Sequence, residues 1–346
     1  MRIPARSSQA KEAILLVEGL QAYFVSKLNA LALAFGEGRS CETVIWGRDG
    51  GNHGGGVRYE TRDPLVFDRG SVNVSQVHYD DVKSKKLGSA TAISTIIHPH
   101  NPHAPSMHMH ISWTQMKEGS GYWRVMADLN PSIISEANLD KKIFSSTLQK
   151  VTGPLYEEGA AQGDRYFNIP ALGRHRGVSH YYLVGYNSGN FERDKNFALE
   201  IAEAVIDTYI SILSVKLTAH KTFTEEDKEE QLAYHTLYLF QVLTLDRGTT
   251  SGLLVHDQND LGIMGSLPSH VNKDILASWV EKMPAPQDSL VEALLKVLPK
   301  EVPTPVEEKT KKALAKAVRK HYKKYPEALR MQASGESVPT TVDNHM

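Results

Sequence analysis

The sequence predicts an α+β fold in which long helices pack on an antiparallel β-sheet. Between residues 43 and 127, runs rich in β-branched and aromatic side chains follow one another through short turns. Turns this short cannot supply the long crossovers that a parallel βαβ array requires. Apolar side chains recur at helical spacing over residues 8–35 and 197–217. We expect a helix at each place, the first capped by Ser8 and covering the sheet.

A glycine-rich stretch, residues 47–56, follows the first expected strand. Six of its ten residues are glycine, so the backbone can approach a ligand or a facing strand without an intervening Cβ. It is not a phosphate-binding loop, because neither GxxxxGK[ST] nor GxGxxG is present. A flexible hairpin loop is the alternative interpretation. The strands expected next are residues 57–59, 65–67 and 72–77, with a turn at 68–70.

The pattern of residues 91–115 predicts two neighbouring strands joined by a sharp connector. The prolines from residue 99 to 105 end the first strand, because proline donates no backbone hydrogen bond. The second strand alternates apolar and polar side chains. The apolar set is Met107, Met109, Ile111 and Trp113, and the polar set is His108, His110, Ser112 and Thr114. One face therefore belongs to a core, and the other offers polar groups to a partner. A further strand at residues 122–127 completes this region.

The sequence signals in the second half of the chain are less specific. A helix begins at residues 224–227 and runs toward Tyr234. Residues 237–245 are too apolar for an exposed strand, which makes them the candidate for a sheet centre or a dimer contact. The basic helix at residues 307–324 is expected to be a solvated, well-capped appendage, although its lysines could also touch nucleic acid or an anionic membrane. We divide the chain into a large N-terminal domain (1–283), a helical C-terminal extension (284–333) and a disordered tail (334–346).

Composition limits the classes of function. With 346 residues, of which 41% are hydrophobic and 23% charged, the chain can bury one large core or two smaller ones. The net charge of −1 gives no global preference for nucleic acid or an acidic membrane surface. No apolar run approaches the ~20 residues that span a bilayer, and no signal-peptide core follows the first residues. The single cysteine, Cys41, excludes an intramolecular disulfide and favours a reducing, cytoplasmic location.

Five motifs together resemble the oxygen-dependent coproporphyrinogen III oxidases. They are WGRDGGNHGGGVRY (46–59), VFDRGSVNVSQVH (66–78), ISTIIHPHNPHAPSMHMHIS (93–112), ADLNP (127–131) and LDRGTTSGLL (245–254). They occur in the family's order and at its spacings, over roughly residues 10–275. The resemblance implies a flat antiparallel sheet with helices on both faces, an active-site cleft over one face, and a homodimer, for which we expect contacts through residues 237–268.

The resemblance also implies an activity. The family converts two propionates of coproporphyrinogen III to vinyl groups, giving protoporphyrinogen IX in haem biosynthesis. It consumes molecular oxygen, releases carbon dioxide and peroxide, and needs no redox cofactor, because the reduced pyrrole itself reacts with oxygen. A substrate with four carboxylates requires a wide cleft, several cations and an acceptor for the pyrrole N–H groups. No nucleic-acid partner and no stable membrane insertion are expected.

The resemblance assigns catalytic roles to two residues. His108 matches the family's proposed acid/base, and an imidazole can exchange protons near neutral pH. Asp128 matches the carboxylate that binds the pyrrole nitrogens and stabilises positively charged intermediates. Outside the motifs, His108 would read as a histidine that bonds its neighbours on the sheet, and Asp128 as an ordinary Asx-turn residue.

Five further residues are candidates for substrate contact. Arg176 aligns with an arginine near the substrate carboxylates, and its planar fork suits bidentate binding of a propionate. A surface ion pair is the competing account. Arg247 matches a residue that the family keeps in a strand near the cleft, although bracing Asp246 is an equal alternative. The remaining three candidates are Ser94, His110 and Ser112.

The sequence departs from the family at charged positions. An arginine of the family is replaced by Ser112, which removes a cation that could meet a propionate. The family's suggested metal set, of which His98 and His108 are the weak candidates here, lacks two histidines, at Ser145 and Ala171. A divalent metal is therefore possible but not expected, since a firm site needs three or four ligands. Two alternatives follow: a non-catalytic tetrapyrrole-binding protein, and a metal-dependent enzyme in which His98, His108 and His110 converge.

Overall fold

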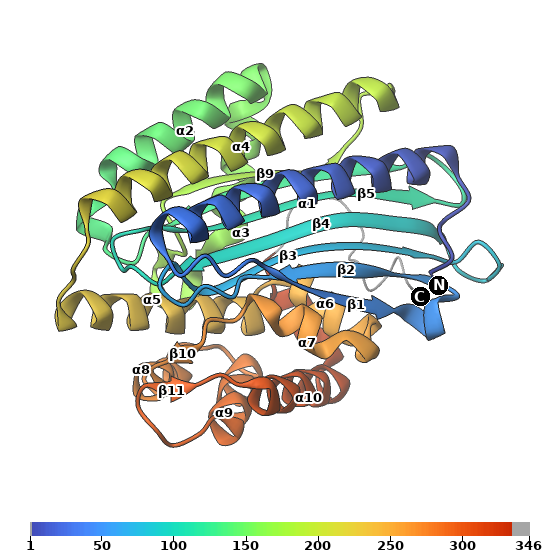
Figure 1. Cartoon of the computed structure of the whole chain (residues 1–346). Coiled ribbons are helices and arrows are strands. Elements are labelled where there is room, and N and C mark those ends of the chain that lie inside the picture. The colour runs from blue at the N-terminus through green and yellow to red at the C-terminus, as the bar shows by residue number, and fades with distance from the viewer. Residues whose placement is uncertain (1, 334–346) are drawn as a thin grey trace.

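A seven-stranded antiparallel sheet forms the centre of the molecule, in the order β1-β2-β3-β4-β5-β6-β9 (Figure 1). The computed structural model describes residues 2–333. The strands are β1 (Glu42–Gly47), β2 (Gly54–Glu60), β3 (Phe67–His78), β4 (Leu87–Pro99), β5 (Ser106–Met116), β6 (Tyr122–Asn130) and β9 (Ser179–Tyr186). Every neighbouring pair is antiparallel. The expected α+β architecture is confirmed.

Three helices cover one face of this sheet: α1 (Ser8–Phe35), α2 (Asn138–Thr152) and α4 (Phe191–Ala219) (Figure 1). The first and third confirm the two helices expected from periodicity. The predicted cap is wrong by one residue, because the side chain of Ser7 accepts the hydrogen bond from the backbone N–H of Ala10. The apolar side chains of β5 pack against these helices in one core with Phe24 and Tyr209.

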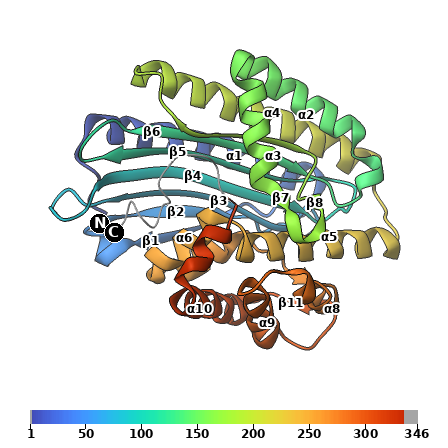
Figure 2. The same ribbon diagram turned by 180° about the vertical axis from the view of Figure 1, so that it is seen from behind.

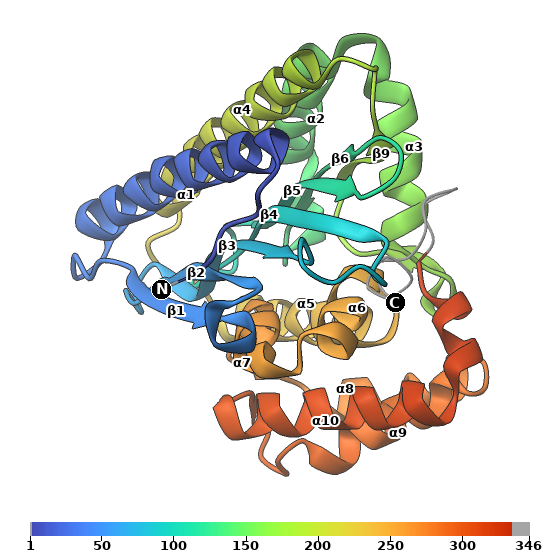
Figure 3. The same cartoon turned by 90° about the vertical axis from the view of Figure 1, so that its right-hand side faces the viewer.

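The opposite face lies under α5 (Glu225–Thr244), α6 (Arg247–Val255) and α7 (Asp260–Ile263), as Figure 3 shows end-on. The capping box at Thr224 and Asp227 confirms the predicted helix start. The helix continues through residues 237–245, so the idea that this run lies at a sheet centre is wrong: all positions from 234 to 244 are buried, which makes the segment apolar on every side. These side chains are buried within one chain and are not free to form a dimer contact.

The C-terminal helices form an outer layer against α5 (Figures 1 and 3). These are α8 (Lys273–Ala277), α9 (Gln287–Val297) and α10 (Glu308–Lys324), joined by the short pair β10 (His270–Val271) and β11 (Thr304–Pro305). Leu314 and Val318 of α10 share one apolar cluster with Leu239 of α5. The expected solvated, well-capped appendage is therefore wrong: one face of α10 is core, and Glu307 makes no side-chain cap. The tail at 334–346 lies outside the described residues.

Smaller differences concern the strands. The turn expected at residues 68–70 is part of β3, where a bulge shifts the register between Phe67 and Arg69. Strand β9 was not predicted; α3 (Tyr156–Phe167) and the pair β7 (Asn168–Ile169) and β8 (Arg174–His175) lie beside it (Figure 2). The glycines serve a facing strand, since a Cβ on Gly54 would lie 2.1 Å from the carbonyl oxygen of Gln76 in β3. No helix among residues 2–333 is both long and apolar enough to cross a membrane.

Candidate active site

A cleft lies between the polar face of the sheet and the roof formed by α5, α6 and residues 256–266. Its volume is about 280 Å³, close to the lower end of ligand sites, which run from ~300 to ~1,000 Å³. The predicted division of β5 is confirmed. Its polar set lines the cleft, whereas Met107, Met109 and Ile111 are fully buried on the other side.

The central feature of the floor is a hydrogen-bonded chain from His108 to Arg176. His108 and Asp128 are direct cross-strand partners in β5 and β6, which places their side chains on one face. His108 Nδ1 lies 2.8 Å from Asp128 Oδ1. Asp128 Oδ2 accepts hydrogen bonds from Arg176 Nη2 at 2.8 Å and from Asn130 Nδ2 at 2.6 Å. The sequence-predicted residues His108, Asp128 and Arg176 are thus brought together.

Asp128 is fully buried below His108 and is not among the residues that line the cleft. Burial opposes its ionisation, but Arg176 and His108 outweigh burial and hold the pKa of this carboxyl well below its usual range. An ionised carboxylate only accepts hydrogen bonds, so His108 carries its proton on Nδ1. The other nitrogen, Nε2, has no hydrogen-bond partner among residues 2–333, and His108 lines the cleft.

Arg176 is held in place by contacts on every side. Its Nη1 donates to Gln241 Oε1 at 2.7 Å and its Nη2 donates to Asp128, while the guanidinium lies over the rings of Phe167 and Tyr238. Only 1% of the residue is exposed. Both terminal nitrogens therefore already donate inside the protein, which leaves Nε, which has no partner in residues 2–333, as the guanidinium atom open to a ligand.

Two other arginines line the cleft without a carboxylate partner. Arg124, in β6, lies directly opposite Ser112 in β5, and its guanidinium contacts Thr114 Oγ1 at 3.4 Å and Tyr122 Oη at 3.2 Å. Arg247 begins α6. Neither forms an ion pair in the described part of the chain. Arg247 does not brace Asp246, whose carboxylate instead caps α6 through the N–H of Thr249 and accepts from the Tyr166 hydroxyl.

Sequence reasoning missed Arg124. The signal was present, because strand alternation places residue 124 on the same face of β6 as residues 126 and 128. The sequence does not reveal the register between β5 and β6. This register places Arg124 opposite Ser112, the position at which the family has an arginine. A positive charge is thus present on the neighbouring strand.

Several polar atoms of the lining have no hydrogen-bond partner within residues 2–333. Each is buried, and a buried polar group without a partner costs roughly 1–3 kcal/mol. They are Trp46 Nε1, Asn73 Oδ1, Ser112 Oγ, Arg124 Nε and Arg176 Nε. Their number in one cleft indicates a surface that a polar ligand completes.

His110 and Ser94 also line the cleft, as expected. Burial lowers the pKa of His110 to about 3, and the electrostatic effect of His108 and Arg124 acts in the same direction. His110 is therefore a neutral hydrogen-bonding group at physiological pH rather than a cation. Ser94 pairs with His110 across β4 and β5, which places both at the centre of the floor.

The alternative of a histidine cluster is not supported among the described residues. His98 is fully buried, with Nδ1 bonded to Ser106 Oγ at 2.9 Å and Nε2 bonded to the carbonyl oxygen of Ser266 at 3.1 Å. Burial and the nearby His235 lower its pKa well below the usual value. With both nitrogens used, His98 does not fit a metal shared with His108. The convergence of His98, His108 and His110 is absent from the groups of possible ligands in residues 2–333.

Comparisons with known proteins show which sequences this chain resembles. A family model described as coproporphyrinogen III oxidase matches residues 13–302. The rat mitochondrial oxygen-dependent coproporphyrinogen-III oxidase is 30% identical over 277 residues, which is 73% of this chain and 60% of the rat protein. The enzyme of the same name from Rickettsia bellii is 32% identical over 241 residues, covering 65% of this chain and 82% of that protein. The chain thus spans about 60% of the length of the mammalian relatives it matches.

Proposed function

Because this chain belongs to the coproporphyrinogen III oxidase family, we propose that it catalyses the oxygen-dependent decarboxylation of two propionates of coproporphyrinogen III, in haem biosynthesis. One observation carries the proposal: His108 presents an unbonded Nε2 to the cleft while Asp128, fully buried, holds its other nitrogen. This is the arrangement of a general acid/base whose tautomer is fixed by a carboxylate.

In the proposed reaction each propionate side chain, as its anion, reacts with one O₂ and one proton to give a vinyl group, CO₂ and hydrogen peroxide. The two electrons pass from the reduced pyrrole and its side chain to oxygen. His108 Nε2 takes a proton from the substrate, with the pyrrole N–H as the acid, and Asp128 stabilises the resulting imidazolium across the 2.8 Å contact. Asp128 then acts through His108, rather than on the pyrrole nitrogens as the resemblance implied.

Substrate carboxylates are assigned to Arg124 and Arg247, since each lines the cleft without a carboxylate partner in the described chain. Arg176 positions Asp128 instead. From His108 to Ser112, the partner of Arg124, β5 rises about 14 Å over four residues. Only an extended ligand can contact both His108 and Arg124, and a tetrapyrrole with propionate arms has this form. Ser94, His110 and Ser112 supply neutral hydrogen bonds between these two ends.

Molecular oxygen is the co-substrate, in keeping with the names of the relatives, and no redox cofactor is required in this proposal. We propose a homodimer as well. Its contact surface has to avoid residues 237–245, whose side chains are already buried within one chain. A cytoplasmic location rests on the single cysteine, Cys41.

The test is anaerobic incubation of the protein with coproporphyrinogen III, followed by admission of oxygen and analysis of the porphyrins. We expect protoporphyrinogen IX, with EDTA present or absent. His108→Ala should abolish conversion and leave binding intact. Arg124→Met should instead weaken substrate binding by roughly 10- to 100-fold, as expected for a lost charge-assisted hydrogen bond. Lys117→Met, on an exposed loop between β5 and β6, is the matched charge-removal control.

Tight binding of coproporphyrinogen without conversion would contradict the oxidase and leave the alternative of a tetrapyrrole-binding protein. Unchanged affinity in Arg124→Met would contradict the assignment of this arginine alone.

A further inference from the structure

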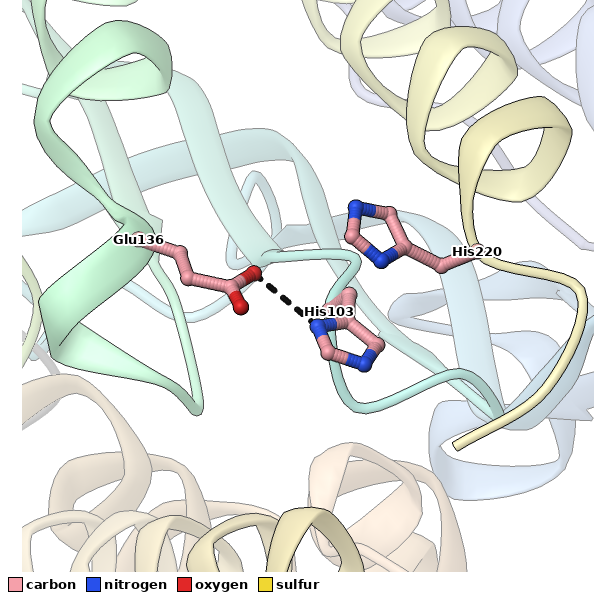
Figure 4. A group of neighbouring side chains, drawn as sticks. All are labelled: His103, Glu136 and His220. Carbon is pink, nitrogen blue, oxygen red and sulfur yellow. Dashed lines mark hydrogen bonds and ion pairs between the residues drawn. The ribbon is translucent and has the colours of Figure 1, made fainter. Parts of the chain in front are cut away.

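A second group of metal-binding side chains lies away from the cleft, where three segments distant in sequence meet. His103 belongs to the connector between β4 and β5, Glu136 ends a single 3₁₀ turn after β6 (Ile134–Glu136), and His220 caps the C-terminus of α4. Figure 4 shows their three side chains gathered around one space. None of the three lines the cleft described above.

The geometry is close to that of a coordination shell. The candidate ligand atoms of His103, Glu136 and His220 all lie within 4.8 Å of one another. His103 Nδ1 is 2.9 Å from Glu136 Oε2, and the rings of His103 and His220 are stacked, with centroids 4.0 Å apart and planes 16° apart. In a tetrahedral zinc site with ~2.0–2.1 Å bonds, neighbouring ligand atoms are about 3.4 Å apart. The nitrogen lone pairs lie in the ring planes, so one imidazole has to rotate out of the stack before both rings can bind a single ion.

A second carboxylate lies on the far side of His103. Its Nε2 lies 3.4 Å from Oδ2 of Asp227, in the first turn of α5. That carboxylate is already engaged in the capping box with Thr224. Asp227 is thus placed to hold the second nitrogen of His103, which is how carboxylates orient metal-bound imidazoles.

The backbone around the two histidines is fixed independently of any ion. The side chain of Asn101 donates to the carbonyl oxygen of His220 at 2.6 Å and accepts from the backbone N–H of His103 at 3.0 Å. Asn101 is itself buried. One amide therefore holds both ligand-bearing residues in register, which reduces the ordering that a bound ion must impose. No hydrogen bond to either ring nitrogen of His220 occurs in residues 2–333, so this imidazole has no partner that a metal must displace.

We infer that His103, Glu136 and His220 form a site for a divalent transition metal of the zinc class, separate from the cleft. Two imidazoles and one carboxylate suit such ions, whereas Ca²⁺ and Mg²⁺ prefer oxygen ligands. Glu136 and His220 are only partly covered, which leaves a path of entry and room for a water as fourth ligand. The ion would tie the β4–β5 connector, which leads into the strand of His108, to the end of α4. This inference does not depend on the proposed oxidase activity.

The experiment is zinc binding to the purified, EDTA-treated full chain, followed by equilibrium titration, metal analysis after desalting, and thermal unfolding. We expect one zinc per chain and a rise in Tm on adding zinc, because an ion that binds only the folded state stabilises it. His103→Ala, His220→Ala and the milder Glu136→Gln should each weaken zinc binding by more than ~10- to 100-fold, the range for outer-shell partners alone. His100→Ala is the matched control, since this exposed histidine is on the same connector but outside the group.

Two results would overturn the inference. One is wild-type protein that retains less than a tenth of an equivalent of zinc. The other is zinc affinity that falls no more in the three ligand variants than in His100→Ala. Far-UV circular dichroism of each metal-free variant separates loss of a ligand from loss of the fold, and Glu136→Gln keeps the test decisive if a histidine variant fails to fold.

Discussion

The two faces of β5 differ in whether their side chains find all their partners within the protein. On the helix side, Met107, Met109 and Ile111 are fully buried in a continuous apolar core. On the cleft side, one residue along, His108 is oriented by a buried carboxylate and Ser112 has a buried hydroxyl without a partner in the described chain. The first face is complete by itself, and the second is completed by a ligand. The strand therefore separates stability from binding by the alternation of its side chains alone.

The largest expected effect comes from breaking the charge pair on the cleft side. Asp128→Asn leaves the guanidinium of Arg176 buried without its counter-ion, which costs about 3–5 kcal/mol of unfolding free energy. An amide in that place no longer fixes the tautomer of His108, so turnover should fall by roughly 10³- to 10⁴-fold. Urea unfolding and initial rates measure the two effects. Turnover within tenfold of wild type would contradict the assigned role of Asp128.

A somewhat smaller effect, on stability alone, is expected from the apolar side. Ile111→Ala removes a fully buried side chain and should cost about 3 kcal/mol of unfolding free energy. Turnover by the protein that remains folded should be unchanged. The neighbouring Ser112→Ala is the matched control on the cleft face: it removes a buried hydroxyl that has no partner in the described chain, so the free energy of unfolding should not fall. A larger loss of stability in Ser112→Ala than in Ile111→Ala would reverse the comparison.

The smallest effect is a dependence of stability on pH that belongs to the cleft face. The pKa of His110 is about 3 in the folded state against about 6.5 unfolded, so between these values the unfolded chain binds more protons. The stability that neutral His110 contributes is complete above about pH 6.5 and is lost as the pH falls. The loss reaches about 2 kcal/mol at pH 5. His110→Asn should therefore show a flatter decline between pH 7 and pH 5 in urea unfolding. Parallel curves for the two proteins would contradict this.

Much of the fold could be predicted from local sequence signals. The alternation in β5, the helix at 8–35 and the capping box before α5 each depend on residues close together in the chain. The run at 237–245 could not be assigned, because a segment buried on all sides has no periodicity to distinguish helix from strand. His108 and Asp128 were identified through motifs, but the burial of Asp128 depends on β6 being a central strand, which sequence alone did not establish.

The remaining site residues needed tertiary structure. Arg124 became visible only through the β5–β6 register. The histidine-rich run suggested a metal site built from its own members, whereas His103 finds its neighbours in Glu136 and His220, which are far along the chain. Arg176 was expected near the substrate, and the structure shows that its two terminal nitrogens donate to Asp128 and Gln241. In each case the partners of the residue lie far along the chain, where the local sequence does not reveal them.

The layering of the roof has a consequence for the exchange of a bulky ligand. Helix α5 packs against the sheet on one side and against α9 and α10 on the other. Moving it would therefore expose two apolar interfaces to water. Residues 254–263, by contrast, include no buried side chain. The free energy of opening is lowest where the fewest apolar contacts are lost. We therefore expect the cleft to open for ligand exchange by movement of residues 254–263, while the floor that carries His108 stays in place.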